Sequence, residues 1–494
     1  MRVLLRAGKA PDVVLGPEAT LAGSSVGVFG SNSGNLLFSS SVHRAISVPG
    51  VEVVADSFQC ERSPSTEALA KKISEEYDAL VVPLANAFRP SFAGKLHKLA
   101  KLINLLAIPV IVPGVGAQLP VDGNPEAETD ETNEATSAFV KAVLGKSATI
   151  GVRGEMTKNY LLHLGFPDDL VDVIGCPSLY DGGYGLRVDK RVPTLEADSK
   201  VVINTGQLVP GAGEFVARAT AEYPNSHFVG QSHEELSLLL WGTPIAKRHP
   251  GLAASADHQL FREDRLRFFV DAKTWVDYFR DRDFAIGGRI HGNIAALLAG
   301  TPAVPLAWDS RIRELSEYHA IPFEISPSLS GGLDIKAIYD AADYTEFNRR
   351  VPENLTRYNE FLERNGLAHT HQPGKANPAY DEKIAKLSFP PPVSAPVGEN
   401  ATKLLLDRLR WLRQGAPEEK ARTEKGFIPQ FGKGGVSEQD ELKDLKRDLA
   451  KTRKQLTETE SALATLTKRL DKVDGGKTKG SGKSKIRAVI RKVR

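Results

Sequence analysis

Arg289 and His291 have the residue types and spacing that best suit ligand binding and proton transfer. They lie where a predicted strand ends and a predicted helix begins. The apolar run Phe284–Ile286 predicts a buried strand, and Gly287–Gly288 then allows close approach to the backbone. A helix is predicted to start at Gly292–Asn293, and free N–H groups at a helix start attract anions. A surface turn also fits Arg-x-His, but the strand end and paired glycines favour a site for a charged ligand and a proton transfer.

Length and composition predict a soluble protein of two domains with extensions. The chain has 494 residues, of which 41% are hydrophobic and 25% charged. Its two cysteines, Cys60 and Cys176, exclude a disulfide scaffold and a cysteine-rich metal site, and we expect both to be reduced and buried. The start of the chain has too short an apolar run for a signal peptide, and no stretch reaches membrane-span length. These features predict a cytoplasmic protein.

The first part of the chain alternates short apolar runs with amphipathic segments, which is typical of a parallel sheet covered on both faces. The run Val26–Phe29 predicts a first strand that enters the turn Gly30–Asn35, and this turn fits a ligand loop or a plain turn equally. The acidic stretch Asn124–Glu134 predicts a solvated loop. Further strands are predicted at Val51–Ala55, Leu80–Leu84, Pro109–Pro113, Ala148–Val152 and Val171–Ile174.

A second alternating set follows a glycine-rich connection. The pattern therefore predicts two doubly wound α/β lobes, with a cleft between them at the strand ends. Its strands are predicted at Lys200–Asn204, His227–Gln231, Leu266–Phe269, Phe284–Ile286, Ala303–Leu306 and Pro322–Ile325. The predicted boundaries are 1–180 for the first lobe, 181–198 for the linker, 199–385 for the second lobe and 386–435 for an irregular linker with one helix.

The C-terminal region has a different character. Leucine recurs every seven residues from Leu442 to Leu470, and this heptad pattern predicts a coiled coil over 436–473 and a homo-oligomer. Residues 477–494 hold eight Lys/Arg and no acid; without them the net charge of +3 would be −5. The predicted tail, 474–494, fits an anionic membrane surface, here the inner face of the plasma membrane. A solubilising tail is the rival interpretation, whereas missing aromatic residues and the acidic body argue against nucleic acid.

Several of these segments together resemble the polysaccharide pyruvyl transferase family. The resemblance covers about residues 20–385 and is carried by Asn32–Asn35, Ile150–Arg153, Gly175–Ser178 and, most strongly, Ile286–Glu314. Asn35 stands where the family's version of the first turn has Asp, so no carboxylate role is expected there. The family implies two Rossmann-like lobes in a GT-B-like arrangement.

The resemblance also implies an activity. Members move the enolpyruvyl group of phosphoenolpyruvate onto two hydroxyls of a sugar, forming a cyclic ketal and releasing phosphate. The expected acceptor is a cell-envelope polysaccharide or its lipid-linked precursor, and neither a cofactor nor a metal is expected.

The expected site residues divide by role. His291 is the acid/base and Arg289 is catalytic as well as donor-binding, because arginine pairs with carboxylate or phosphate through two parallel hydrogen bonds. Arg153 is expected to reach the donor from the other lobe, with Gly292 and Asn293 at its phosphate. The acceptor is assigned to Asn32, Gly34, Asn35 and Gln118 of the first lobe.

Two other functions fit the same pattern. A GT-B-type nucleotide-sugar glycosyltransferase or epimerase would use the same two lobes but bind a nucleotide sugar. An inactive membrane-associated scaffold would keep the coiled coil and bind no small ligand.

Overall fold

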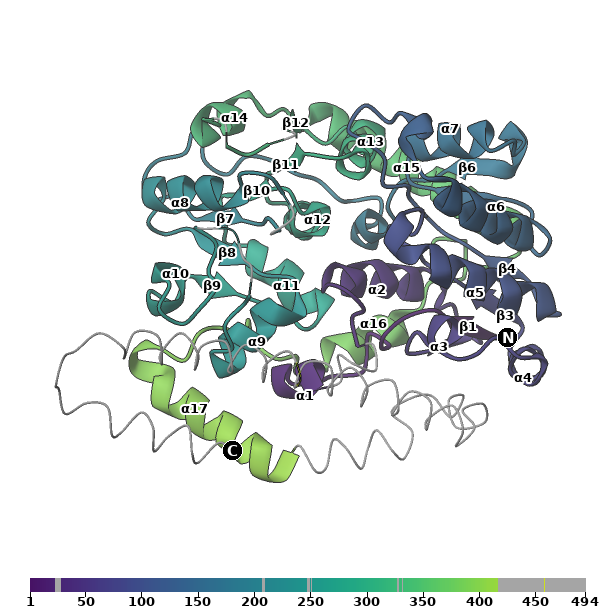
Figure 1. The fold of residues 1–494 in the computed structure, drawn as a ribbon, viewed down its shortest axis with the longest axis horizontal. Helices are drawn as coiled ribbons and strands as arrows, with labels where there is room; N and C mark the ends of the chain where they lie inside the picture. The colour runs from purple at the N-terminus through teal and green to yellow at the C-terminus, as the bar shows by residue number, and fades with distance from the viewer. Residues whose placement is uncertain are drawn as a thin grey trace, which may run out of the picture. The chain divides into compact units, whose positions relative to one another are not determined.

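Two parallel β-sheets flanked by helices form the body of the protein (Figure 1). The structure, a computed structural model, describes residues 1–22, 28–206, 209–246, 249, 251–326, 328–330, 332–415 and 457. All described residues up to 415 belong to one compact unit, residues 1–435. The α/β class with two parallel sheets is confirmed. The predicted coiled coil and basic tail lie outside the described residues, apart from Thr457.

The first sheet has the strand order β2-β1-β3-β4, and the pair β5-β6 continues it through parallel bonding between Val115 and Val152. The register pairs Val3 with Val53 and Ala79, and Leu80 with Val110. The strands are β1 (Arg2–Leu5), β2 (Glu52–Ala55), β3 (Ala79–Val81), β4 (Val110–Ile111), β5 (Ile150–Val152) and β6 (Val171–Val173). Around them lie α2 (Gly34–Ile46), α3 (Gln59–Arg62), α4 (Glu67–Glu76), η2 (Pro90–Phe92), α5 (Ala93–Leu105), η3 (Pro125–Ala127), α6 (Asp130–Leu144), α7 (Glu155–His163), η4 (Asp168–Leu170) and η5 (Pro177–Gly182).

Successive side chains of β1 are buried in two different hydrophobic clusters, as expected for a strand covered on both faces. Leu4 packs in a cluster with residues of α4, α5 and α6, whereas Val3 and Leu5 pack in a cluster with residues of α2. The short apolar runs of this lobe therefore form a fully buried sheet.

The second sheet has the order β9-β8-β7-β10-β11-β12, the 3-2-1-4-5-6 order of a Rossmann sheet. Its strands are β7 (Val201–Ile203), β8 (His227–Val229), β9 (Leu266–Arg267), β10 (Phe284–Gly287), β11 (Ala303–Ala307) and β12 (Glu324–Ile325). Its helices are α8 (Ala212–Glu222), α9 (His233–Trp241), α10 (Gln259–Arg262), α11 (Ala272–Phe279), α12 (Ile290–Leu298), α13 (Ser310–His319) and α14 (Ile335–Ala341). Because the strand order reverses between β7 and β10, these two strands flank the position where such sheets bind ligands.

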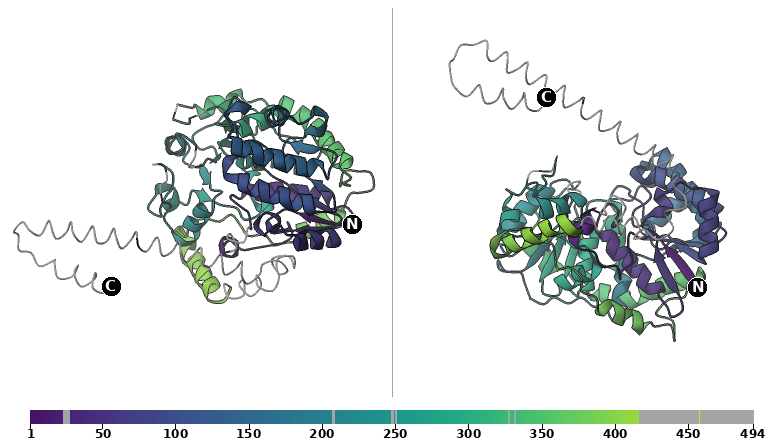
Figure 2. Two further views of the ribbon diagram at one scale, coloured as in Figure 1. Left: turned by 45° about the vertical axis from the view of Figure 1, so that its right-hand side comes forward. Right: turned by 90° about the horizontal axis from the view of Figure 1, so that it is seen from below.

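The lobes exchange terminal elements. Helix α15 (Thr345–Arg364) buries Leu355, Tyr358 and Phe361 in the first-lobe cluster, and α16 (Pro378–Ala385) bonds to α2 through Arg44 and Asp381. In the other direction, α1 (Pro17–Ala22) packs against α9 of the second lobe. After η6 (Gly398–Asn400), α17 (Ala401–Arg410) crosses the second lobe beside α1, before the last described turn, η7 (Trp411–Gly415) (Figure 2).

Three local predictions are wrong. The first strand is Arg2–Leu5, and Val28 and Phe29 are buried without strand pairing because they pack in the cluster of the second lobe. The predicted acidic loop ends early, since α6 begins at Asp130, and Thr129 caps it by accepting from Thr132 N. Helix α12 begins at Ile290, two residues before the predicted start.

Candidate active site

A cavity of about 660 Å³ lies where strand ends of both lobes face each other, with α2 and α12 between the two sheets (Figure 1). Its wall is strongly cationic. Among the described residues, the only carboxylate in its lining is Glu61, against seven cationic side chains: Arg6, Arg62, Arg89, Lys95, Arg153, Arg289 and Arg311. Such a wall favours a ligand with more than one negative charge.

The turn after β10 places Arg289 at the cavity. Gly287 has a φ of +150°, and a Cβ there would overlap the backbone of Asn204, so only glycine lets β10 run so close to the end of β7. The backbone N of Arg289 donates to Asn204 Oδ1 at 3.3 Å, and its Nε donates to Thr205 O at 3.4 Å. Its guanidinium group lies against Gly206, where a Cβ would come within 2.9 Å.

His291 follows in the first turn of α12 and is only 8% exposed. Burial, aided by the Arg153 and Arg311 guanidinium groups, holds its pKa well below the ordinary value of 6.5. Its Nε2 lies 4.0 Å from Cys176 Sγ. His291 is therefore a neutral imidazole that can accept a proton from a ligand.

Arg153 reaches His291 from the first lobe. It follows β5, is 1% exposed, and donates from Nε to Gly114 O at 3.0 Å. Its guanidinium lies 5.1 Å from the Phe38 ring centroid, with Nη2 3.8 Å from Cys176 Sγ. Burial lowers its pKa from 12.5. Arg153, Arg289 and His291 thus line one cavity, as the sequence predicted.

Gly292 and Asn293, the predicted phosphate-binding pair, do not line this cavity. Asn293 is fully buried, and its Nδ2 donates to Gly287 O at 3.0 Å and Arg289 O at 3.1 Å. A Cβ at Gly292 would lie 2.8 Å from the Asn204 side chain. Both residues therefore shape the turn that carries Arg289.

The predicted acceptor residues divide in the same way. Asn32, Asn35 and Gln118 line the cavity, whereas Gly34 does not. A Cβ at Gly34 would come within 2.6 Å of His291 Nδ1, so this glycine lets α2 approach α12. Asn32 Oδ1 accepts from Gly34 N at 2.9 Å and shapes the turn.

Sequence reasoning missed much of the cationic wall. Arg6 directly follows β1 and pairs with Glu61, which also accepts from Lys95 at 2.9 Å. Arg89 has a buried Nε with no hydrogen-bond partner among the described residues, and Arg311 pairs with Asp309. The position of Arg6 directly after an apolar run could have predicted that it lies at a strand end near the cavity.

Helix α13 ties the second lobe to the first beside this site. Glu314 accepts from Thr157 N at 2.9 Å and Thr157 Oγ1 at 2.8 Å, at the start of α7, and burial raises its pKa to about 7. Ser310 Oγ accepts from Leu119 N at 2.9 Å. Arg313 belongs to Ile286–Glu314, the segment that most resembles the family, but its side chain pairs with Glu317 of the same helix.

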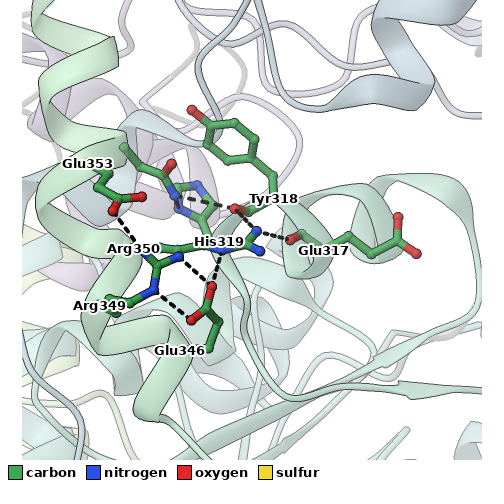
Figure 3. A network of polar contacts seen from close by, with 8 residues as sticks. Glu317, Tyr318, His319, Glu346, Arg349, Arg350 and Glu353 are labelled. Carbon is green, nitrogen blue, oxygen red and sulfur yellow. Dashed lines mark hydrogen bonds and ion pairs between the residues drawn. The ribbon is translucent and has the colours of Figure 1, made fainter.

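The end of α13 positions the loop that carries Cys176. His319 Nε2 accepts from Cys176 N at 3.0 Å, and burial lowers the pKa of His319 to about 3, so the ring stays neutral and able to accept. Arg350 of α15 donates to the carbonyl oxygen of Glu317 at 3.2 Å and pairs with Glu346 (Figure 3). This network fixes the end of β6 next to His291.

Both cysteines are free and buried, as predicted. Among the described residues, no group of three or more His, Cys, Asp or Glu side chains is arranged to hold a metal ion. No helix within the described ranges is long and apolar enough to cross a membrane.

Comparison with known proteins gives one family. The model of the family described as polysaccharide pyruvyl transferase matches residues 32–310. No curated protein matches the chain. Among solved structures, the UDP-GlcNAc 2-epimerase of Neisseria meningitidis bound to UDP-GlcNAc is similar at 14% identity and a TM-score of 0.35, over 83% of this chain and 99% of that one. The UDP-GlcNAc 2-epimerase of Methanocaldococcus jannaschii has 12% identity and a TM-score of 0.37, over 74% and 99%.

Proposed function

This chain belongs to the polysaccharide pyruvyl transferase family, and we propose that phosphoenolpyruvate is its donor. The enolpyruvyl group passes to two hydroxyls of one sugar, giving a cyclic ketal and inorganic phosphate. The acceptor is a cell-envelope polysaccharide or its lipid-linked precursor.

The observation that carries this proposal is a buried neutral imidazole inside a cationic cavity. In the described part of the chain, seven cationic side chains and one carboxylate line the cavity around His291. Phosphoenolpyruvate carries a carboxylate and a phosphate, and arginine can pair with either through two hydrogen bonds. Arg289 from the second lobe and Arg153 from the first can hold one small dianion between them.

His291 can move the proton that the reaction needs. One sugar hydroxyl adds to C2 of the donor and gives its proton to the neutral imidazole, which passes it to the methylene carbon C3. The C2–O bond to phosphate then breaks, and the second hydroxyl adds to C2 while its proton leaves with the phosphate. Two hydroxyl protons are thus placed, one on C3 and one on phosphate.

The acceptor is proposed to lie on the first-lobe side of the cavity. Asn32, Asn35 and Gln118 line this side with neutral amides, which suit sugar hydroxyls as donors and acceptors. Arg89 lies on the same wall.

Two further parts of the proposal, the coiled coil and the basic tail, rest on sequence pattern alone. The coiled coil at 436–473 joins copies of the chain, and the basic tail at 474–494 docks the cytoplasmic enzyme on the inner face of the plasma membrane. The two lobes are proposed to follow a GT-B-like plan, which the Rossmann strand order of the second sheet supports. The reaction needs no metal or cofactor.

A ligand panel followed by product analysis tests the donor. Phosphoenolpyruvate should raise the melting temperature and release phosphate when the matching hexoside is present, and mass spectrometry should find the ketal. Stabilisation by uridine or guanosine sugars, with no response to phosphoenolpyruvate, would show a nucleotide-sugar enzyme instead.

Arg289→Ala tests the site within the same assay. It should weaken donor binding at least 10-fold, because a charged hydrogen bond is lost. The matched control is Arg280→Ala, since Arg280 is 63% exposed and pairs only with Asp277 among the described residues. Equal donor titrations for the two variants would refute the assignment of Arg289.

A further inference from the structure

Gln231 has a buried side-chain amide at the cavity, and its N–H donors are unpaired in the part of the chain that the structure describes. It follows β8 and is 2% exposed, yet it lines the cavity. Its backbone is fully engaged: N donates to Glu235 Oε2 at 2.7 Å, and O accepts from Ser33 N at 2.9 Å. Its Nε2 has no hydrogen-bond partner among the described residues. A buried donor left unpaired is costly, which points to a ligand that accepts from it.

Thr205 presents a second unused group next to it in the sheet. It follows β7, is 1% exposed, and its Oγ1 has no hydrogen-bond partner within the described ranges. A Cβ at Gly288, which lines the cavity, would lie 3.5 Å from this oxygen. Trp308 and Val209, which line the cavity, border the same space, so the missing side chain of Gly288 leaves the hydroxyl next to the cavity.

These groups come from three adjacent strand ends. Strands β8, β7 and β10 are neighbours in the sheet and contribute Gln231, Thr205 and Arg289. A Cβ at Gly292 would come within 2.9 Å of Gln231 Nε2, so the amide lies against the first turn of α12. That turn begins a nine-residue helix, whose N-terminus favours a negative charge.

We propose that Gln231, Thr205 and Arg289 form the subsite for the phosphate of the donor. The two N–H groups of the amide, the hydroxyl, the guanidinium and the helix N-terminus together offer more donors than the roughly four acceptor sites of a carboxylate, whereas the three terminal oxygens of a phosphate offer more acceptor sites. Gln231 is then a specificity-determining residue that selects phosphoenolpyruvate over donors without phosphate. This inference rests on the proposed function, because it assigns one end of that donor.

Competition by the two halves of the donor tests the subsite in the full-length protein. Inorganic phosphate and pyruvate each displace phosphoenolpyruvate, and their inhibition constants are measured separately. Gln231→Ala should weaken inhibition by phosphate about 10-fold. Gln231→Glu should weaken it further, because it replaces the N–H donor with a negative charge. Inhibition by pyruvate should change less than about twofold in both.

Two further variants keep the result interpretable. Gln259→Ala removes an exposed glutamine of α10 and should leave both constants unchanged. Thr205→Val keeps the shape of the side chain but removes the hydroxyl. It should weaken inhibition by phosphate and leave inhibition by pyruvate unchanged. This variant tests the subsite even if the Gln231 variants fail to fold. Weakened pyruvate inhibition, or unchanged phosphate inhibition in folded variants, would overturn the proposal. If the phosphate result holds but no hexoside is pyruvylated, the subsite stands and the proposed function fails.

Discussion

His291 is surrounded by guanidinium groups, and this environment decides which proton it can move. A buried imidazole near Arg153 and Arg311 resists a positive charge, so the free protein presents a base. A bound anion would offset the nearby positive charges and raise the pKa of His291. The donor itself would then allow the imidazole to carry the proton from hydroxyl to C3.

We expect this change to be visible by histidine-selective ¹⁵N NMR. In the free protein, the His291 signal should stay in its neutral form as pH falls through 6.5, because the pKa lies well below that value. Saturating phosphoenolpyruvate should move its titration to higher pH. The signal is assigned by its loss in His291→Gln. A free-protein titration centred near 6.5 would contradict the assignment.

Replacing His291 with alanine should slow turnover about 10²- to 10⁴-fold, the range of a lost acid/base group. Donor affinity should change far less, because Arg153 and Arg289 remain. Phosphate release and donor titration measure the two effects separately. Release at the parental rate with a matching acceptor would rule out proton transfer by His291.

At the residue scale, sequence alone identified the groups that directly follow predicted strands. Arg153, Arg289 and His291 meet because each follows the carboxyl end of a strand, and the carboxyl edges of the two sheets face one cavity. Asn293 was misassigned because a side chain at a helix start can face the ligand or its own turn, and here it bonds to Gly287 and Arg289. Gln231 also follows a predicted strand, but only burial without a partner marks it.

At the scale of elements, the turn from β10 to α12 depends on a glycine. Gly287→Ala should lower the free energy of unfolding by about 3 kcal/mol or more, because a Cβ overlaps backbone and the φ of +150° is strained. Gly94→Ala is the matched control: it lies exposed in α5 with nothing within 4 Å of its Cβ, and should be neutral or stabilising by up to about 1 kcal/mol. Urea titrations measure both, and equal effects would refute the packing argument.

The contact between α2 and α12 predicts a different kind of defect. Gly34→Ala should push the new methyl into His291 Nδ1 and the Asn32 side chain, which lie 2.6 and 2.8 Å from its Cβ. The imidazole must move, so turnover should fall at least 10-fold, as a misplaced catalytic group predicts. Phosphate-release kinetics and the melting temperature are measured together. Unchanged turnover in a folded variant would show that α2 does not position His291.

Most apolar runs that form strands were predicted as strands, but the first was not. Val28 and Phe29 were misread because a short buried run looks the same in a loop and in a strand. The sequence analysis predicts no strand at Arg2–Leu5, where β1 lies. That omission also hid Arg6, which follows it into the cavity.

For the whole described unit, the exchange of elements between lobes could not be read from the sequence. Periodicity shows that α15 has an apolar face but does not show which sheet covers it. The structure places that face on the first sheet, although the helix follows the second in the chain.

Buried histidines come from several elements, and together they make the stability of the folded protein depend on pH. His43, His291 and His319 are buried in the folded protein with lowered pKa values, about 4 for His43 and about 3 for His319. In the unfolded chain these imidazoles bind protons near pH 6.5, whereas in the folded protein they do not. The folded protein therefore keeps their full contribution to stability above pH 6.5 and loses it as the pH drops below that value. Glu314, with its pKa raised to about 7, opposes this trend because it binds a proton in the folded state.

His43→Gln isolates one contribution, because His43 lies on α2 and does not line the cavity. Between pH 6.5 and 5.5, the wild type should lose about 1 kcal/mol more unfolding free energy than this variant, since one pKa unit corresponds to about 1.4 kcal/mol. Urea titrations at several pH values measure the difference. Parallel pH profiles would mean that His43 is protonated in the folded protein. Because the variant still carries His291, His319 and Glu314, the difference reports His43 alone, and the remaining slope reports the other buried groups.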